Sequence, residues 1–251
     1  MEDIKKIYEY YFTYDKIIPF KGLSIHPVLV SEYFEFFNAI NCLTIEKDKI
    51  PDVKIISMSY LDFLFDKIKN DKQDGEIYSS MLVEIVRLCL KVEPENFKYI
   101  NNNGKITLII NNVEINKKEF DLLKRIICYQ NTPDYDDSYI NPELKEALDE
   151  ADRLKNDSRI TGSCSLERQI VCIMASTSYK KEDIMNMPIR KFILLLQIID
   201  SKLHYEIYKT GECSGMVSFK QPITHWMYYK NNKFDSLIKY DSFKEKMKHA
   251  T

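Results

Sequence analysis

The longest regular pattern of apolar and polar positions in the chain runs from Ser165 to Trp226. Within it, five apolar residues recur at alternating spacings of three and four, which places them on one helix face: Ile189, Phe192, Leu196, Ile199 and Leu203. A second apolar line widens this face: Ile193, Leu195 and Ile198. Pro188 fits the first turn and Gly211 the stop. We therefore predict a long core helix that is buried on more than one side.

Shorter patterns before this stretch predict a hairpin and several helices. Between residues 10 and 30 the sequence alternates loosely, which is typical of a β-hairpin with its tight turn at Gly22. Pro19 and Pro27 restrict this hairpin to the edge of a sheet. Apolar residues at helical spacing then predict three helices, over residues 31–40 with Ser31 as N-cap, 53–68, and 78–92.

Between residues 97 and 115 the period of the apolar residues changes to two, which predicts a small antiparallel meander. Two turn signals divide it: Asn103-Gly104 and Asn111-Asn112. Asn116 and, three residues on, Glu119 then form the capping box of another helix. We expect that helix to end near Gln130.

The following segment is our predicted partner surface. An acidic loop leads to Asn141-Pro142, an N-cap followed by Pro at the first helical position. The helix that it starts, residues 142–155, carries only a thin apolar stripe on a heavily charged surface, and such a seam suits a partner better than a core. Tyrosines of the loop would add contact area. The predicted partner-binding residues are Tyr135, Tyr139, Leu144, Leu148 and Leu154. A peripheral helix packed normally on the core is the alternative.

Together these elements predict an α+β fold that is mostly α-helical. Its core would resemble a helical bundle, with an N-terminal β-hairpin and a small central antiparallel meander. Residues 156–163 are rich in Asp, Ser, Thr and Gly and read as a linker. A boundary there gives two domains, residues 1–156 and 164–251, and one continuous domain is the alternative.

Charge and hydropathy narrow the classes of partner. Lys and Arg total 36 against 38 for Asp and Glu, so the net charge of −2 provides no overall field that attracts nucleic acid or anionic lipid. No apolar run approaches the ~20 residues of a membrane span, and the first residues lack the order of a signal peptide. Six cysteines without CxxC spacing read as reduced, mostly buried thiols. We expect an intracellular protein that binds neither nucleic acid nor membrane.

One catalytic pattern occurs, at residues 211–215, where Cys213 would be the nucleophile of a G-x-nucleophile-x-G elbow. An elbow needs a strand before the nucleophile and a helix after it, whereas here a helix precedes and a strand follows. Its partners would be Asp235 or Asp241 with His249. A cysteine-dependent hydrolase is therefore the alternative function, and our leading interpretation predicts no catalytic residue.

No metal or cofactor site is predicted either. The acidic loop around Asp134, Asp136 and Asp137 has the look of a calcium loop. An EF-hand starting at Asp134 would need Gly and Glu where Tyr139 and Lys145 stand, and Asx-turns explain the loop better. The histidines show no metal-binding spacing, and no Gly-rich nucleotide loop occurs.

The order of segments is similar to that of a known class of viral proteins. The segments are IPFKGLSIHPV, PDVKIISMSYLDFLF, EFDLLKRIICYQN, the stretch from Ser165 to Asp200, and SGMVSFKQPITHW. Their order resembles tail or baseplate assembly proteins of long-tailed bacteriophages of low-GC Gram-positive bacteria, over most of the sequence. The region after Ser165 resembles the helical end of tail assembly chaperones, which are shorter and lack the central meander.

That resemblance implies a non-enzymatic protein with no cofactor. It would present apolar and aromatic surfaces to other phage tail or baseplate proteins in the cytoplasm of the infected bacterial host. Oligomerisation and retention in the virion stay open.

Overall fold

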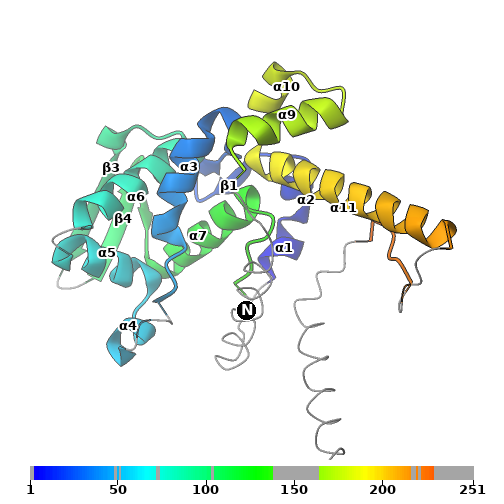
Figure 1. Cartoon of the computed structure of the whole chain (residues 1–251). Coiled ribbons are helices and arrows are strands. Elements are labelled where there is room, and N and C mark those ends of the chain that lie inside the picture. Colours follow the sequence, from blue (N-terminus) through cyan, green and yellow to red (C-terminus); the bar gives the residue numbers. More distant parts are fainter. Residues whose placement is uncertain are drawn as a thin grey trace, which may run out of the picture. The chain divides into compact units, whose positions relative to one another are not determined.

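The computed structural model describes residues 3–47, 50, 52–71, 74–102, 105–137, 164–215, 219 and 222–228 (Figure 1). The predicted α+β, mostly α-helical class is confirmed, with an N-terminal hairpin and a separate antiparallel sheet. The protein divides into two compact units. Unit 1 comprises residues 1–136 and 179–195, and unit 2 comprises 137–178 and 196–251. The predicted linker, residues 156–163, lies outside the described residues, so the boundary there stays a prediction.

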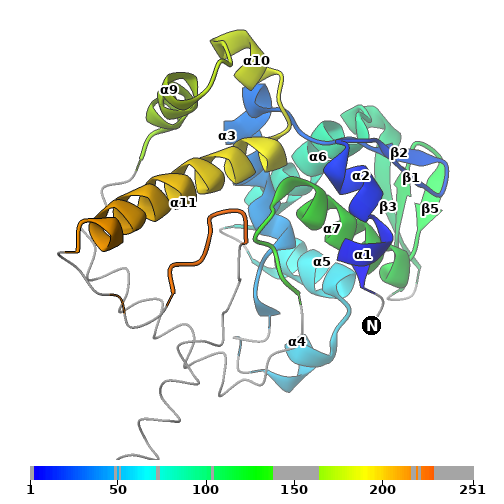
Figure 2. The same ribbon diagram turned by 90° about the vertical axis from the view of Figure 1, so that its right-hand side faces the viewer.

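Unit 1 begins with two short helices and the predicted hairpin. Helix α1 (Ile4–Ile7) packs against α7 (Lys117–Asn131), and α2 (Glu9–Thr13) follows it directly (Figure 2). Strands β1 (Ile18–Phe20) and β2 (Leu23–Ile25) then pair antiparallel. Lys21 and Gly22 both have positive φ, 50° and 83°, as a two-residue turn of the I′ kind requires. The predicted turn at Gly22 is therefore confirmed.

Three helical segments after the hairpin differ from the predicted boundaries. A 3₁₀ turn η1 (Val30–Glu32) leads into α3 (Tyr33–Ala39) and a second 3₁₀ turn η2 (Ile40–Leu43). Ser31 lies inside η1, so the predicted N-cap is wrong: Glu32 is the N-cap of α3, because residues 30–32 form a 3₁₀ turn before the α-helix begins. The predicted helix 53–68 is two helices, α4 (Val53–Ser57) and α5 (Tyr60–Asn70), because Ser59 is extended and its Oγ caps the Asp62 amide.

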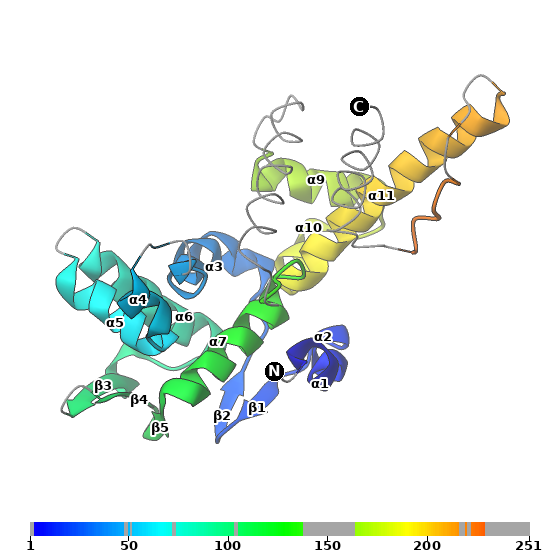
Figure 3. The ribbon, with the colours of Figure 1, turned by 90° about the horizontal axis from the view of Figure 1, so that it is seen from below.

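Helix α6 (Gly75–Leu90) and the 3₁₀ turn η4 (Pro94–Asn96) lead into the second sheet. Its strands are β3 (Phe97–Asn102), β4 (Lys105–Ile110) and β5 (Val113–Ile115), in the antiparallel order β3-β4-β5 (Figure 3). The predicted meander is therefore confirmed, and the turn at Asn111-Asn112 has φ of 49° and 66°. The turn predicted at Asn103-Gly104 lies outside the described residues.

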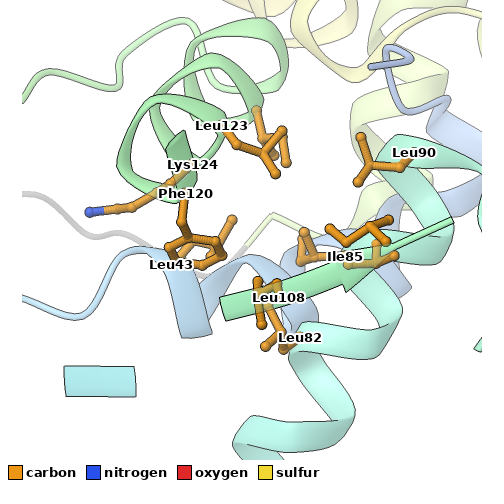
Figure 4. Close-up of a pocket in the computed structure, with 11 residues that line it drawn as sticks. Leu43, Leu82, Ile85, Leu90, Leu108, Phe120, Leu123 and Lys124 are labelled. Atoms are coloured by element: carbon orange, nitrogen blue, oxygen red, sulfur yellow. The ribbon is translucent and has the colours of Figure 1, made fainter. Parts of the chain in front are cut away.

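The core of unit 1 lies where α6, α7, η2 and β4 meet. Their side chains surround a small cavity of about 10 Å³, the space of one water-sized probe (Figure 4). It is lined from all four elements by Leu43, Leu82, Ile85, Leu108, Phe120 and Leu123. Burial of such side chains contributes about 1.5–3 kcal/mol each to stability, so this layer holds β4 of the sheet against α6 and α7.

The last helices are α9 (Leu166–Ser176), α10 (Lys181–Met185) and α11 (Ile189–Cys213). Ser165 caps α9 through the amide of Arg168. Helix α11 continues past the predicted stop at Gly211, and the left-handed residue after it is Gly215, with φ of 70°. The predicted burial on more than one side is wrong. Ile189 and Phe192 are buried, whereas Leu203 and Ile207 are 53% and 65% exposed.

In unit 2, aromatic residues from the segment after α11 pack on the second half of that helix. The ring of His225 lies 4.9 Å from that of Tyr205, and the ring of Phe219 lies 5.5 Å from that of Tyr208. His225 also stacks on Trp226. These contacts cover one side of the helix, and Leu203 and Ile207 stay exposed.

Candidate functional site

The predicted partner surface falls mostly outside the described residues. Tyr139, Leu144, Leu148 and Leu154 lie there, so they stay a prediction. Tyr135 follows α7 and is half-buried, with its ring edge-on to that of Tyr129 at 4.9 Å. It contributes to the packing at the end of α7.

A surface that sequence reasoning missed lies on α1 and α2. The inner face of this helix pair buries Ile4 and Phe12. Four large apolar or aromatic side chains on and just after these helices are between 49% and 61% exposed, and we call them the N-terminal aromatic strip: Ile7, Tyr10, Tyr14 and Ile17. The rings of Tyr10 and Tyr14 lie 5.0 Å apart. The strip therefore offers adjoining aromatic surface to solvent on a helix pair that the core holds in place.

The signal for these helices was present in the sequence. Ile4, Tyr8 and Phe12 recur every four residues, and Asp3 is an N-cap type whose side chain accepts a hydrogen bond from the amide of Lys6. Helices of only four and five residues show too little of the helical period to be predicted from it, and the sequence analysis predicts only a hairpin in residues 10–30.

Beside the strip, unit 1 contains an open cleft of about 730 Å³, which we call the N-terminal cleft. Helices α1 and α2, the end of α7 and the start of α11 line it. Its volume falls in the range of about 300–1,000 Å³ that is typical of small-molecule and cofactor sites. Four cations line the cleft: Lys5, Lys6, Arg190 and Lys191. Three carboxylates line it as well: Asp3, Glu9 and Asp15.

Arg190 is the best-positioned of these charged groups. Its Nη1 donates a 2.6 Å hydrogen bond to the carbonyl oxygen of Tyr129, and its guanidinium lies 5.5 Å from the centre of the Phe12 ring. Burial lowers the pKa of Arg190, and the nearby carboxylates of Asp15 and Asp134 partly offset this. The group is therefore half-buried and fixed in orientation, and the carboxylates that favour its charge lie more than 4.0 Å away.

Asp15 and Arg190 both line the cleft, and their charges interact without an ion pair within 4.0 Å. Burial raises the pKa of Asp15, and the charges of Lys191 and Arg190 oppose that rise. Among the residues that the structure describes, none of the charged groups lining the cleft has an ion-pair partner within 4.0 Å. The cleft therefore keeps its charged groups available to a ligand.

The Cys213 pattern gains no catalytic geometry from the described residues. Cys213 is the last residue of α11 and is exposed, and the Ser214 hydroxyl donates to the carbonyl oxygen of Gly211. The expected partners, Asp235, Asp241 and His249, lie outside the described part of the protein. The hydrolase therefore stays a prediction.

Neither a metal site nor a membrane span is found among the described residues. No three His, Cys, Asp or Glu side chains there come together as a metal site would require, and this holds for Asp134, Asp136 and Asp137. None of the helices described is both long and apolar enough to span a membrane.

Comparison of the sequence with protein-family models, with curated proteins and with solved structures finds no match. Two surfaces of unit 1 bear on the function of the protein: the N-terminal aromatic strip and the N-terminal cleft.

Proposed function

We propose that this protein acts by binding another protein through the N-terminal aromatic strip, as a tail or baseplate assembly protein of a long-tailed bacteriophage. The observation that carries the binding function is the exposure of four neighbouring side chains on and just after α1 and α2, which are Ile7, Tyr10, Tyr14 and Ile17. The phage setting comes from the resemblance of the protein's segments to such proteins.

The strip has the composition and support of a protein interface. Aromatic residues are enriched at interfaces, and tyrosine supplies large contact area together with a hydroxyl that can hydrogen-bond. Adjoining exposed apolar side chains on a soluble protein mark interaction sites, whereas single ones do not. The inward Ile4 and Phe12 anchor the helix pair, so a partner would meet a largely preformed surface.

The proposed partner is another tail or baseplate protein. The protein would meet it in the cytoplasm of the infected bacterial host, where tails are assembled, and retention in the virion is a second possibility. A gene neighbourhood that includes tail-tube and tape-measure genes would support this setting. A position alone among metabolic genes would argue against it.

The test is affinity capture of the tagged protein from infected cells, with identification of the copurified proteins. The double variant Tyr10→Ser/Tyr14→Ser should weaken capture of a tail or baseplate protein by roughly 10- to 100-fold, because each interface anchor contributes about 1–2 kcal/mol. Both side chains are about 60% exposed, so the thermal midpoint should hardly change.

The matched control is Tyr228→Ser, since Tyr228 is 73% exposed and lies in unit 2. It should capture the same protein as the wild type. Equal capture by the strip variant and the control would remove the strip from the proposal. Copurified proteins unrelated to the virion would overturn the phage assignment.

A further inference from the structure

The N-terminal cleft contains a guanidinium with unused hydrogen-bonding capacity. Arginine has five N–H donors, and one of those of Arg190 is bound to the Tyr129 carbonyl oxygen. In the part of the protein that the structure describes, Arg190 has no carboxylate within 4.0 Å. Burial of this cation is costly, and the charges of Asp15 and Asp134 offset that cost only in part, so an oxyanion bound to the guanidinium would stabilise it further. The bond to Tyr129 also fixes the guanidinium plane, which favours two-point recognition of an oxyanion.

The other lining groups decide which oxyanion fits. Lys5 and Lys191 strengthen the positive side of the cleft, with the Lys5 ammonium 5.2 Å from the Tyr129 ring centre. Glu9 and Asp15 provide acceptors on the same surface. These carboxylates, and the net charge of −2, disfavour a dianionic phosphate or a nucleic-acid backbone. A peptide fits the mixture, because it combines a singly charged carboxylate with backbone N–H donors.

We propose that the N-terminal cleft binds a carboxylate of a partner's peptide segment, with Arg190 as the direct ligand and Lys191 beside it. The carboxylate accepts hydrogen bonds from the free edge of the guanidinium, and the peptide N–H groups donate to Asp15 or Glu9. Leu194, which is 37% exposed, provides apolar surface for the flanking side chain. The inference rests on the proposed function only in that its ligand belongs to a protein, and it does not require the aromatic strip.

The two sources of such a carboxylate are the C-terminus of a polypeptide and an acidic side chain. Two pairs of fluorescein-labelled hexapeptides of otherwise neutral sequence separate these sources. The first pair has a free C-terminal carboxylate or a C-terminal amide. Both peptides of the second pair end in an amide, and they contain one internal Glu or, in its place, Gln. Binding to the full-length protein is measured by fluorescence anisotropy at low salt. One of the two carboxylate peptides should bind roughly 10- to 100-fold more tightly than its neutral counterpart.

Two variants connect that binding to the cleft. Arg190→Gln keeps a donor for the Tyr129 carbonyl oxygen and should remove most of the carboxylate preference. Lys191→Glu reverses the charge at an exposed position, so it should weaken binding even if Arg190→Gln fails to fold. Lys202→Gln, on the exposed part of α11 in unit 2, is the control and should bind as the wild type does.

Three results would overturn the proposal. The first is equal binding of the carboxylate and neutral peptides, and the second is full binding by folded Arg190→Gln or by Lys191→Glu. The third is displacement of the peptide by inorganic phosphate or a short oligonucleotide at a lower concentration than by free acetate. Each of these can occur while the Tyr10→Ser/Tyr14→Ser variant still loses its partner, so this inference and the strip fail separately.

Discussion

The Nζ of Lys21 lies 2.6 Å from Oε1 of Glu119, across a sequence separation of 98 residues. Lys21 belongs to the turn of the β1–β2 hairpin, and Glu119 completes the capping box of α7 by accepting from the Asn116 amide at 2.8 Å. The same lysine donates to the carbonyl oxygen of Glu114. One carboxylate therefore both caps α7 and fastens the hairpin turn to it.

The first prediction concerns the charge of Glu119. The hydrogen bond from Lys21, followed by that from the Asn116 amide, lowers the pKa of Glu119 below its ordinary value. A lowered folded-state pKa means that the stabilisation is present above the unfolded pKa of about 4.3 and is lost as the pH falls through the folded value. Glu119→Gln keeps a cap residue but removes the charge. Its free energy of unfolding should be up to about 1 kcal/mol lower at pH 7, because the pair is partly exposed.

Urea unfolding at pH 7, 5 and 3 checks this prediction. The difference from the wild type should become smaller as the pH falls and the Glu119 carboxylate takes up a proton. Glu114→Gln is the matched control, because Glu114 is exposed and interacts with Lys21 through its backbone. A difference between wild type and Glu119→Gln that persists unchanged at pH 3 would contradict the role of the charge.

The second prediction concerns Asn131, a fully buried polar residue at the end of α7. Its Oδ1 accepts a 2.8 Å hydrogen bond from the Val28 amide, and its Nδ2 donates to the Ile127 carbonyl oxygen. Asn131→Ala leaves the Val28 N–H without this acceptor, so the free energy of unfolding should fall by about 1–3 kcal/mol. Asn186→Ala also loses a hydrogen bond, but an exposed one, and should cost much less. Equal losses in urea unfolding would contradict the prediction.

The third prediction concerns Gly75, the first residue of α6. A Cβ added there would lie 2.4 Å from the Ile68 carbonyl oxygen, which belongs to the backbone of α5. In most helices Gly→Ala stabilises by about 0.5–1 kcal/mol, but here the backbone must shift, at a cost of about 1–3 kcal/mol. Gly75→Ala should therefore lower the thermal midpoint. Ser80→Ala, at an exposed position of the same helix, should leave it unchanged or raise it, and a stabilised Gly75→Ala would refute the clash.

Features set by neighbouring residues could be predicted from the sequence. The turns at Gly22 and at Asn111-Asn112 need positive φ, which these residue types adopt most readily, and the Asn116–Glu119 box needs only a spacing of three. The break between α4 and α5 also has a local signal, because Ser59 is a strong N-cap type. The apolar residues keep their helical spacing through the break, however, and that spacing predicts one continuous helix.

Features made by distant residues could not be predicted. The N-terminal cleft joins residues 3–15 with Tyr129 and with residues 190–194, and no pattern along the sequence connects them. The exposure of the second half of α11 could not be predicted, because the apolar residues of a helix face have the same spacing whether that face is buried or open to solvent. The strip on α1 and α2 was missed because short helices give little periodicity.

The fourth prediction concerns the six cysteines, of which half are buried and half exposed. Cys42, Cys89 and Cys128 are buried, and burial raises the pKa of the Cys42 thiol to about 12 and raises the pKa of Cys89 as well. Three thiols should therefore react with Ellman's reagent at pH 8 in the native protein, and six in urea: the exposed ones are Cys164, Cys172 and Cys213.

The same experiment bears on the hydrolase alternative. An activated nucleophile reacts faster than an ordinary exposed thiol at neutral pH. Cys213→Ser would then remove the fastest phase of the reaction with a thiol probe, whereas Cys172→Ser would not. If Cys213 reacts no faster than Cys164 and Cys172, the hydrolase hypothesis is excluded.

The last prediction measures how far the core extends along α11. Phe192 is fully buried and its ring lies edge-on to that of Tyr33 at 6.3 Å, whereas Leu203, on the same face three turns later, is 53% exposed. Phe192→Ala should lower the free energy of unfolding by about 3–5 kcal/mol. Leu203→Ala removes little buried surface and should cost less than about 1 kcal/mol. Urea unfolding of both variants shows whether Leu203 is exposed, as in the structure, or buried, as the apolar pattern of the sequence predicts. A buried Leu203 would make Leu203→Ala cost about 2–5 kcal/mol of the free energy of unfolding, as Leu→Ala does in packed interiors.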